Sequence, residues 1–291
     1  MITGEHAVVY GHPAIVAAID QRIAVQLTPV EEPILTVCSD LAGQVSTPMS
    51  TIEPISPYRF INAAVLLYRD RIPAGLRIDI SSDIDPTLGL GSSAAVTIAV
   101  LAALNGKVDG DLHAKALKIV RDLQGRGSGA DLAASLWGGV RSYQVSVKGP
   151  AVSQPLPMLP QLSLFNVGYK TPTGEVLAKV AEAQAKDPER YEAIYLEMGR
   201  VSKSTIAAVE ALQWAEVGAL FSEYQTLMAD LGVSDAAIES ALRTAYETNG
   251  VRGAKISGSG LGDCVLACDA VPDGFVPVRV AQEGVVFHGN G

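Results

Sequence analysis

A glycine-rich turn that opens an apolar helical run is the segment best suited to chemistry in this sequence. Residues Gly89–Ser93 read Gly-Leu-Gly-Ser-Ser and lead into the run Ala94–Leu104. Glycines let a backbone approach a phosphate closely, and the free N–H groups and positive dipole end of a helix attract anions. The hydroxyls of Ser92 and Ser93 could bond a phosphate oxygen or ligate magnesium. The alternative is an ordinary helix start capped by serines.

The spacing of this turn excludes two common nucleotide-binding motifs. No Gly-Lys-Ser/Thr sequence follows it, so it is not a Walker A loop, and the dinucleotide Gly-x-Gly-x-x-Gly spacing fails.

Two further glycine-rich segments carry charged side chains. The segment Gln124–Asp131 ends in a carboxylate at the start of a predicted helix. Asp131 is there either as a helix N-terminal acid, stabilised by the dipole, or as a base aimed at a substrate hydroxyl. The segment Lys255–Asp263 is a second turn, between two apolar runs. Three such loops in one acidic chain are hard to explain as turns that only join secondary-structure elements.

Charge and composition narrow the function classes. The 291 residues include 22 Lys and Arg against 31 Asp and Glu, a formal net charge of −9. This balance argues against sequence-independent DNA binding, which rests on basic patches, and an anionic ligand must be held by local groups. The three cysteines show no metal-site spacing, no apolar run is long enough to span a membrane, and no signal peptide is visible. We expect a cytoplasmic protein.

Apolar periodicity predicts strands and helices in both halves of the chain, without regular alternation, which favours an α+β fold. The prolines between Pro150 and Pro160 mark the best candidate linker. Strands are predicted at Ala7–Tyr10, Ala14–Ile19, Arg22–Thr28, Ile34–Cys38, Gly75–Ser81, Val140–Val147, Leu162–Gly168, Ala254–Ser257, Cys264–Cys268 and Phe275–Ala281, and helices at Tyr58–Asp70, Ala94–Leu104, Leu112–Leu123, Asp131–Trp137 and from Glu175 to Glu247.

Four segments together resemble the GHMP kinase superfamily, which comprises galactokinases, homoserine kinases, mevalonate kinases and phosphomevalonate kinases. Gly4–Ala14 resembles its first motif in the mevalonate kinase form, and Pro86–Ala95 resembles its ATP-phosphate motif. Gly127–Gly139 resembles the catalytic-aspartate segment, and Lys255–Cys264 resembles the third motif. The order and spacing of the four cover nearly the whole chain.

The resemblance implies a kinase that transfers the γ-phosphoryl group of ATP, with Mg²⁺, to a hydroxyl of mevalonate in isoprenoid precursor synthesis. It implies a two-domain α+β fold, with a ribosomal protein S5-like N-terminal domain over residues 1–150 and a ferredoxin-like C-terminal domain with added helices over residues 151–291. Asp131 would be the catalytic base and Ser93 a magnesium ligand. The implied ATP contacts are Gly89, Leu90, Gly91, Ser92, Ser93, Ala94, Gly258, Ser259 and Gly260, and the implied substrate contacts are Glu5, His6, Ser128 and Thr173.

Two charged residues that the family pattern predicts are missing from this sequence. The family carries Pro-Gly-Lys shortly before Gly-Glu-His, whereas only Met1 to Thr3 precede Gly4. We therefore expect the functional gene product to have residues before Met1. The family's magnesium-binding glutamate lies eleven residues before the catalytic aspartate, where Val120 stands. Asp122 is two residues out of phase, about 200° around a helix.

The acceptor and the activity have alternatives. The Gly-x-Gly-Ser-Gly turn and the Gly-Asp-Cys sequence resemble those of bacterial phosphomevalonate kinases, so phosphomevalonate is the second acceptor. A nucleotide-binding member without catalysis is a third reading. A diphosphomevalonate decarboxylase ranks lower, because it lacks the Gly-Glu-His-Ala-Val-Val-Tyr-Gly opening. The expected partner is a small-molecule substrate, with no nucleic acid and no membrane, and a homodimer is left open.

Four side chains also have plain structural interpretations. His6 fits a half-buried strand as well as a substrate contact, and Lys255 fits the solvated end of a strand. Cys264 and Cys268 have the parity of core residues on one strand.

Overall fold

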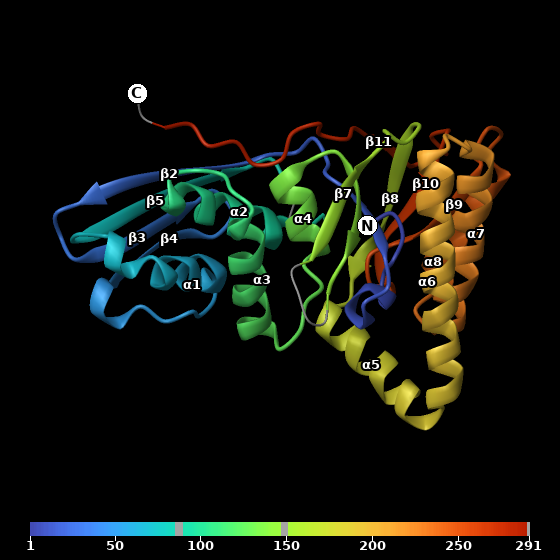
Figure 1. The fold of residues 1–291 in the computed structure, drawn as a ribbon, viewed down its shortest axis with the longest axis horizontal. Helices are drawn as coiled ribbons and strands as arrows, with labels where there is room; N and C mark the ends of the chain where they lie inside the picture. The colour runs from blue at the N-terminus through green and yellow to red at the C-terminus, as the bar shows by residue number, and fades with distance from the viewer. Residues whose placement is uncertain (85–89, 147–150, 290–291) are drawn as a thin grey trace. The chain divides into compact units, whose positions relative to one another are not determined.

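The computed structural model describes residues 1–84, 90–146 and 151–289 (Figure 1). By compactness these residues form two units that are not consecutive along the chain. Unit 1 combines Met1–Asp20 with residues 139–146 and 151–282, and unit 2 combines residues 21–84, 90–138 and 283–289. The division into two domains at residue 150 stays a prediction, because each compact unit combines segments from both sides of that position.

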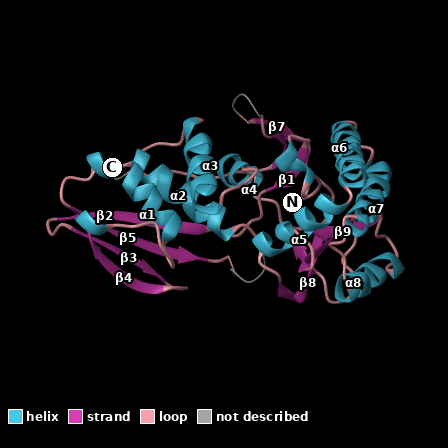
Figure 2. Ribbon diagram, turned by 90° about the horizontal axis from the view of Figure 1, so that it is seen from below, coloured by secondary structure: helices cyan, strands magenta, loops and turns pink. Residues whose placement is uncertain are grey.

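Unit 2 is a sheet with helices on one face. The strand order is β2-β5-β3-β4, antiparallel except for the parallel pair β3 and β5. Along β5, Leu76, Ile78 and Ile80 are buried, while Arg77 and Asp79 lie on the other face. Figure 2 shows α1, α2 and α3 on one side of this sheet. The elements are β2 (Ile23–Val30), β3 (Ile34–Ser39), β4 (Gly43–Pro48), η2 (Met49–Thr51), α1 (Arg59–Leu67), η3 (Arg69–Arg71), β5 (Gly75–Ser82), α2 (Ser92–Asn105), α3 (Asp111–Gln124) and α4 (Ala130–Trp137).

Helix α2 is the centre of unit 2. Its sequence is apolar on every side, which is the pattern of a helix surrounded by protein. It packs against α1, α3, α4 and β2, and Ile98, Val100 and Leu101 are almost completely buried. This packing fixes the helix whose first turn holds the predicted phosphate-binding serines.

Unit 1 contains two sheets and the long helices of the second half. The strand orders are β1-β6-β7 and β11-β8-β10-β9, with antiparallel pairing throughout. All residues of β10 are buried. The elements are η1 (Ala7–Tyr10), β1 (Ala14–Ala17), β6 (Val140–Gln144), β7 (Val152–Leu156), β8 (Leu162–Lys170), α5 (Thr173–Lys186), α6 (Pro188–Glu210), α7 (Trp214–Asp230), α8 (Ala236–Glu247), β9 (Gly253–Ser257), β10 (Gly262–Cys268) and β11 (Val276–Val278).

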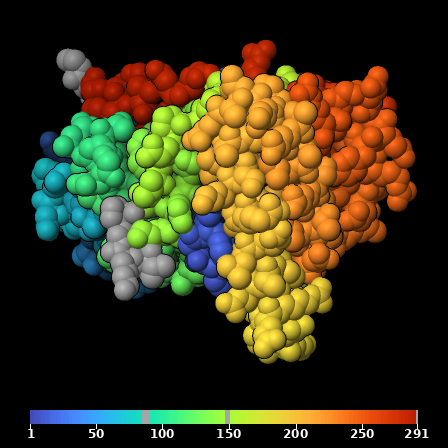
Figure 3. All heavy atoms as spheres, turned by 45° about the vertical axis from the view of Figure 1, so that its right-hand side comes forward, coloured from blue at the N-terminus to red at the C-terminus, as the bar shows by residue number. Residues whose placement is uncertain are grey.

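The helices of unit 1 bury one face of its larger sheet. Helices α7 and α8 pack against β9, and α6 packs against α7 and against the first residues of the chain. In Figure 3 the surfaces of α6 and α7, in yellow to orange, adjoin. Within the described part of the chain, no helix combines the length and the apolar character that crossing a membrane requires.

Two sequence-based assignments are wrong. Ala7–Tyr10 is a 3-10 helix rather than a strand, because His6 (φ 59°) and Gly11 (φ 89°) on either side have left-handed backbone that reverses the chain. The proline-rich segment is not a linker, since Val152–Leu156 is β7 and pairs with β6. Pro155 is tolerated because β7 lies at the edge of its sheet, where one side needs no N–H donor.

Gly75→Ala is expected to destabilise the fold. A Cβ at Gly75 would lie 1.9 Å from the Glu32 carbonyl oxygen, which is backbone and cannot swing away. Overpacking of this kind costs about 1–3 kcal/mol. Gly110→Ala is the control, because a Cβ there meets nothing within 4 Å, and we expect a change below about 1 kcal/mol. Urea denaturation measures both, and an equal midpoint for the two variants would contradict the packing at Gly75.

Candidate functional site

The predicted phosphate-binding turn lies at the start of α2 in unit 2. Gly89 lies outside the described residues. Gly91 precedes the helix with left-handed backbone (φ 80°), and Ser92 and Ser93 form the first helical residues. The first N–H groups of a helix have no acceptor within the helix, and the dipole makes this end positive. The Ser93 side chain is exposed. Leu90 to Ala94 therefore present what an anion requires: backbone donors, a hydroxyl and a positive dipole end.

Asp131 lies beside this turn. It is the second residue of α4, and its side chain is exposed. A Cβ built on Gly91 would lie 3.9 Å from the Asp131 carboxyl carbon. Among the described residues, no hydrogen-bond or ion-pair partner holds this carboxylate. The predicted base and the predicted anion site, 40 residues apart in sequence, are thus neighbours within one unit.

Helix α3 holds the start of α4 in place. His113 Nε2 lies 2.9 Å from the Gly129 carbonyl oxygen, and its ring stacks on Trp137 at 5.2 Å between centroids. Because a carbonyl only accepts, Nε2 carries the proton of this bond. Burial lowers the pKa of His113, while the bond to Gly129 acts in the opposite direction. The Ser128 hydroxyl accepts a bond from the Ala130 N–H at 3.2 Å, directly before Asp131.

At the two positions of α3 that the sequence singled out, Val120 and Asp122, the structure offers no carboxylate to the turn at Leu90–Ala94. Val120 packs against Gly127, where an added Cβ would lie only 2.7 Å from the valine Cγ1. Asp122 is exposed and pairs with Lys118, one turn before it on the same helix, at 2.5 Å. Asp122 therefore does not replace the missing glutamate in this structure.

The first motif lies in unit 1, joined to the third glycine-rich segment. His6 Nε2 donates to the Ser259 carbonyl oxygen at 2.9 Å, and burial lowers the pKa of His6. Lys255 Nζ donates to Glu5 Oε1 at 2.6 Å. Lys255 is completely buried, so its interpretation as a solvated lysine is wrong. Its burial lowers its pKa, against the opposing effect of the Glu5 carboxylate.

Residues 258–261 form a turn that is fixed by side chains. Asp263, itself in left-handed backbone (φ 66°), accepts bonds from the N–H and the hydroxyl of Ser259 at 3.1 and 3.2 Å. Lys170 Nζ lies 3.4 Å from the other oxygen of Asp263. Thr171 Oγ1 donates to the Leu261 carbonyl at 2.6 Å. The turn is therefore tied to the end of β8.

The predicted site residues fall into two groups. Unit 2 brings the turn at Leu90–Ala94 together with Ser128 and Asp131. Unit 1 brings Glu5 and His6 together with Gly258–Gly260. Thr173, the exposed first residue of α5, follows Thr171 by two residues and thus lies next to a segment bonded to the same turn.

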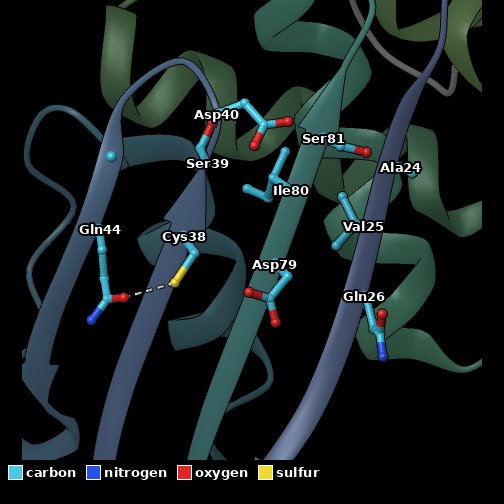
Figure 4. A pocket seen from close by; sticks show the side chains of 11 residues that line it. Ala24, Val25, Gln26, Cys38, Ser39, Asp40, Gln44, Asp79, Ile80 and Ser81 are labelled. Atoms are coloured by element: carbon cyan, nitrogen blue, oxygen red, sulfur yellow. Dashed lines mark hydrogen bonds between the residues drawn. The ribbon is translucent and has the colours of Figure 1, made fainter.

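A pocket on the open face of the unit 2 sheet contains none of these residues. It measures about 540 Å³ and is lined by side chains of β2, β3, β4 and β5. Figure 4 shows Asp40, Asp79 and Gln26 around it, with Cys38 Sγ bonded to Gln44 Oε1 at 3.3 Å. It has neither a helix N-terminus nor a base beside one, so it is a separate feature of the surface.

Comparisons with known proteins match both units. Residues 59–139 fit the family model of the GHMP kinases N terminal domain, and residues 205–268 fit that of the GHMP kinases C terminal. The chain is 31% identical to the mevalonate kinase of Archaeoglobus fulgidus, over 98% of this chain and 95% of that protein. It is 30% identical to the mevalonate kinase of Methanothermobacter thermautotrophicus, over 95% of this chain and 90% of that protein.

The chain belongs to the GHMP kinase family. It is an ATP-dependent kinase that phosphorylates an alcohol. A solved L. major mevalonate kinase in complex with R-mevalonate has a TM-score of 0.74 at 23% identity, covering 98% of this chain and 94% of that one. The Lin0012 protein from Listeria innocua has a TM-score of 0.83 at 21% identity, covering 96% and 94%. These neighbours confirm the predicted two-domain α+β GHMP kinase fold.

Three functional candidates were missed from the sequence. Lys255 looked like a strand-end lysine, although the apolar residues Ala254 and Ile256 on either side of it were a signal that the strand lies in the core, where the structure places both. Asp263 stood in the quoted motif without a role, and a polar residue after a glycine turn is a recognisable signal for a loop-closing acceptor. Tyr224, whose hydroxyl donates to the Glu5 carbonyl at 2.9 Å, gave no local signal.

Stability is expected to fall below about pH 6.5, the ordinary pKa of histidine. Burial lowers the pKa of His6 in the folded state, so between its two pKa values the unfolded chain binds more protons and acid favours unfolding. The variant His6→Asn, which keeps a polar side chain but has no ring that takes up a proton, should lose less stability than the wild type between pH 7 and 5. His288→Asn is the control at an exposed position. Urea titrations at each pH measure the free energy of unfolding. An identical dependence of this free energy on pH in the wild type and His6→Asn would contradict the prediction.

Proposed function

We propose that this chain is a mevalonate kinase, which transfers the γ-phosphoryl group of ATP to a hydroxyl of mevalonate. The observation that carries the kinase chemistry is the Asp131 carboxylate beside the start of α2, with its side chain exposed. The choice of mevalonate is supported by the full-length mevalonate kinase relatives and by the Gly-Glu-His-Ala-Val-Val-Tyr-Gly opening. We expect the reaction in the cytoplasm, on a small-molecule substrate.

Each part of the proposed reaction has residues to perform it. The first-turn N–H groups of α2 and the hydroxyl of Ser92 hold the phosphates of ATP. Asp131 accepts the proton of the acceptor hydroxyl as the hydroxyl oxygen attacks the γ-phosphorus, and the bond from that phosphorus to the β-phosphate oxygen breaks to release ADP. Catalysis of phosphoryl transfer is mainly positioning and charge stabilisation, and these residues supply the positioning and the base. As the family resemblance implies, Gly258–Gly260 are further proposed ATP contacts, and His6, Ser128 and Thr173 are proposed acceptor contacts.

The residues present fit a magnesium ion. No group of three or more His, Cys, Asp or Glu side chains in the described ranges could enclose a metal. Magnesium does not require such a group, since it keeps several waters and binds one or two protein oxygens together with substrate phosphates. The exposed Ser93 hydroxyl is an oxygen donor of this kind. When bound, the ion would neutralise negative charge on the phosphates.

Phosphomevalonate is the second candidate acceptor. The Gly-x-Gly-Ser-Gly turn before Asp131 and the Gly-Asp-Cys sequence at Gly262–Cys264 favour it. An ADP-release assay over mevalonate, phosphomevalonate, homoserine and sugars distinguishes the candidates. Turnover with mevalonate well above that with the other acceptors supports the proposal, and preference for another acceptor contradicts it.

Asp131→Asn should lower kcat by about 10²–10⁴-fold, the usual contribution of a positioned base. The amide is nearly isosteric, so the melting temperature should change little. KM for ATP should also change little, because backbone groups hold the nucleotide. If Asp131 were only a helix N-terminal acid, its loss would cost about 0.3–1 kcal/mol of stability and leave turnover intact. A variant that melts lower and turns over normally would remove Asp131 from the mechanism.

Ser93→Ala should weaken magnesium-dependent turnover more than nucleotide binding. The expected result is a several-fold rise in the Mg²⁺ concentration needed for half-maximal rate, because one oxygen donor is lost. Ser92→Ala, one position earlier in the same turn, is the matched control for loss of a hydroxyl without loss of the metal ligand. Magnesium titrations of initial rate measure both variants, and an unchanged magnesium requirement in Ser93→Ala would exclude Ser93 as a ligand.

A further inference from the structure

A lysine without any exposed surface joins two motifs in unit 1. Lys255 lies on β9, and its ammonium group donates to Glu5 Oε1 at 2.6 Å and to the carbonyl oxygen of Ile256. Lys255 is 0% exposed and Glu5 is 2% exposed. The ammonium also lies 5.3 Å from the centroid of the Tyr224 ring. Among the described residues, the positive charge is therefore held by one carboxylate, one carbonyl and one aromatic face.

The same region fixes the backbone of the first motif. The Tyr224 hydroxyl donates to the carbonyl oxygen of Glu5 at 2.9 Å, so both the side chain and the backbone of this glutamate are held. The next residue, His6, is in left-handed backbone and bonds to Ser259 in the third motif. The Ser257 hydroxyl donates to the Met1 carbonyl at 2.8 Å. The chain start and the third glycine-rich turn thus form one bonded substructure.

Glu5 faces the protein interior rather than an open surface. One carboxylate oxygen binds Lys255, and the second, Oε2, is buried without a hydrogen-bond partner among the described residues. His6 Nδ1 is also buried and has no hydrogen-bond partner among the described residues. A carboxylate with this exposure is better placed to orient its neighbours than to contact a substrate directly.

We propose that the Lys255–Glu5 ion pair positions His6 and the turn at 258–261 for phosphoryl transfer, which makes Lys255 a positioning residue of the kinase. This proposal rests on the proposed function of the same turn. Stability alone gives little reason for such a pair, because two buried charges are costly to desolvate and apolar replacements are often neutral or stabilising. The ion pair instead fixes the orientation of the Glu5 side chain, because its hydrogen bond is directional. Glu5 directly precedes His6 in the chain, so the pair also helps to place His6.

The first experiment separates positioning from stability with a double substitution. Lys255→Met and Glu5→Gln each leave a buried polar group uncompensated and should lower the melting temperature. Lys255→Met combined with Glu5→Leu removes both charges together and should recover most of that loss. The expected result is a folded double variant whose kcat is about 10–100-fold below wild type, the cost of a small displacement in an active site. A stable double variant with wild-type kcat would overturn the proposal.

A milder pair of variants tests the same proposal if the double variant does not fold. Tyr224→Phe removes only the hydroxyl that holds the Glu5 carbonyl. Tyr246→Phe is the matched control, because the Tyr246 hydroxyl donates to the Ala254 carbonyl on β9 at 2.8 Å without contacting the first motif. We expect kcat to fall in Tyr224→Phe and not in Tyr246→Phe, at comparable melting temperatures. Equal kcat in the two variants would overturn the proposal.

All variants are assayed with the acceptor that the wild type phosphorylates. Absence of wild-type turnover on mevalonate contradicts the proposed function and leaves the comparison among variants possible with another acceptor. Wild-type turnover on mevalonate with unchanged kcat in the stable variants contradicts only the role of the ion pair.

Discussion

An acidic kinase must hold a polyanion with few positive side chains, and this constraint accounts for the construction of unit 2. With a net charge of −9, the chain has no general attraction for ATP. A helix N-terminus supplies positive potential from backbone groups that carry no formal charge. Its direction must then be fixed, and the apolar surface of α2 fixes it by packing against three helices and a strand.

The same constraint explains why a cation belongs to the proposed reaction. Asp131 lies next to the start of α2, the proposed phosphate-binding end, so the proposed base and the phosphates would repel one another. Magnesium on the phosphates would offset this repulsion by neutralising part of their negative charge. The contact of α3 with Gly129 matters for the same reason, because it determines where α4 begins and hence where this charge lies.

Glycine-rich turns are useful here only because other residues immobilise them. The turn at 258–261 is bonded through Ser259 to Asp263 and His6, and through Leu261 to Thr171. Glycine allows the close approach, as at Gly258, where a Cβ would lie 2.6 Å from an oxygen of Asp263. Ordering such a turn before substrate arrives removes an entropic cost from the reaction.

The sequence by itself determined the elements with strong local signals. The apolar run after Gly91 predicted α2, the alternation of Leu76, Ile78 and Ile80 predicted β5, and the acid after a glycine turn identified Asp131. These signals act within a few residues. β4 escaped prediction because nearly all of its residues are exposed and no apolar alternation marks it.

Tertiary structure alone decided which of the predicted residues work together. His6, with its positive φ, bonds to Ser259 from the far end of the chain, and the strand β7 pairs with β6. The environment of Lys255 is the clearest case. Its partner Glu5 lies 250 residues away in sequence, and only the closed fold brings the two charged groups to 2.6 Å and removes both from water.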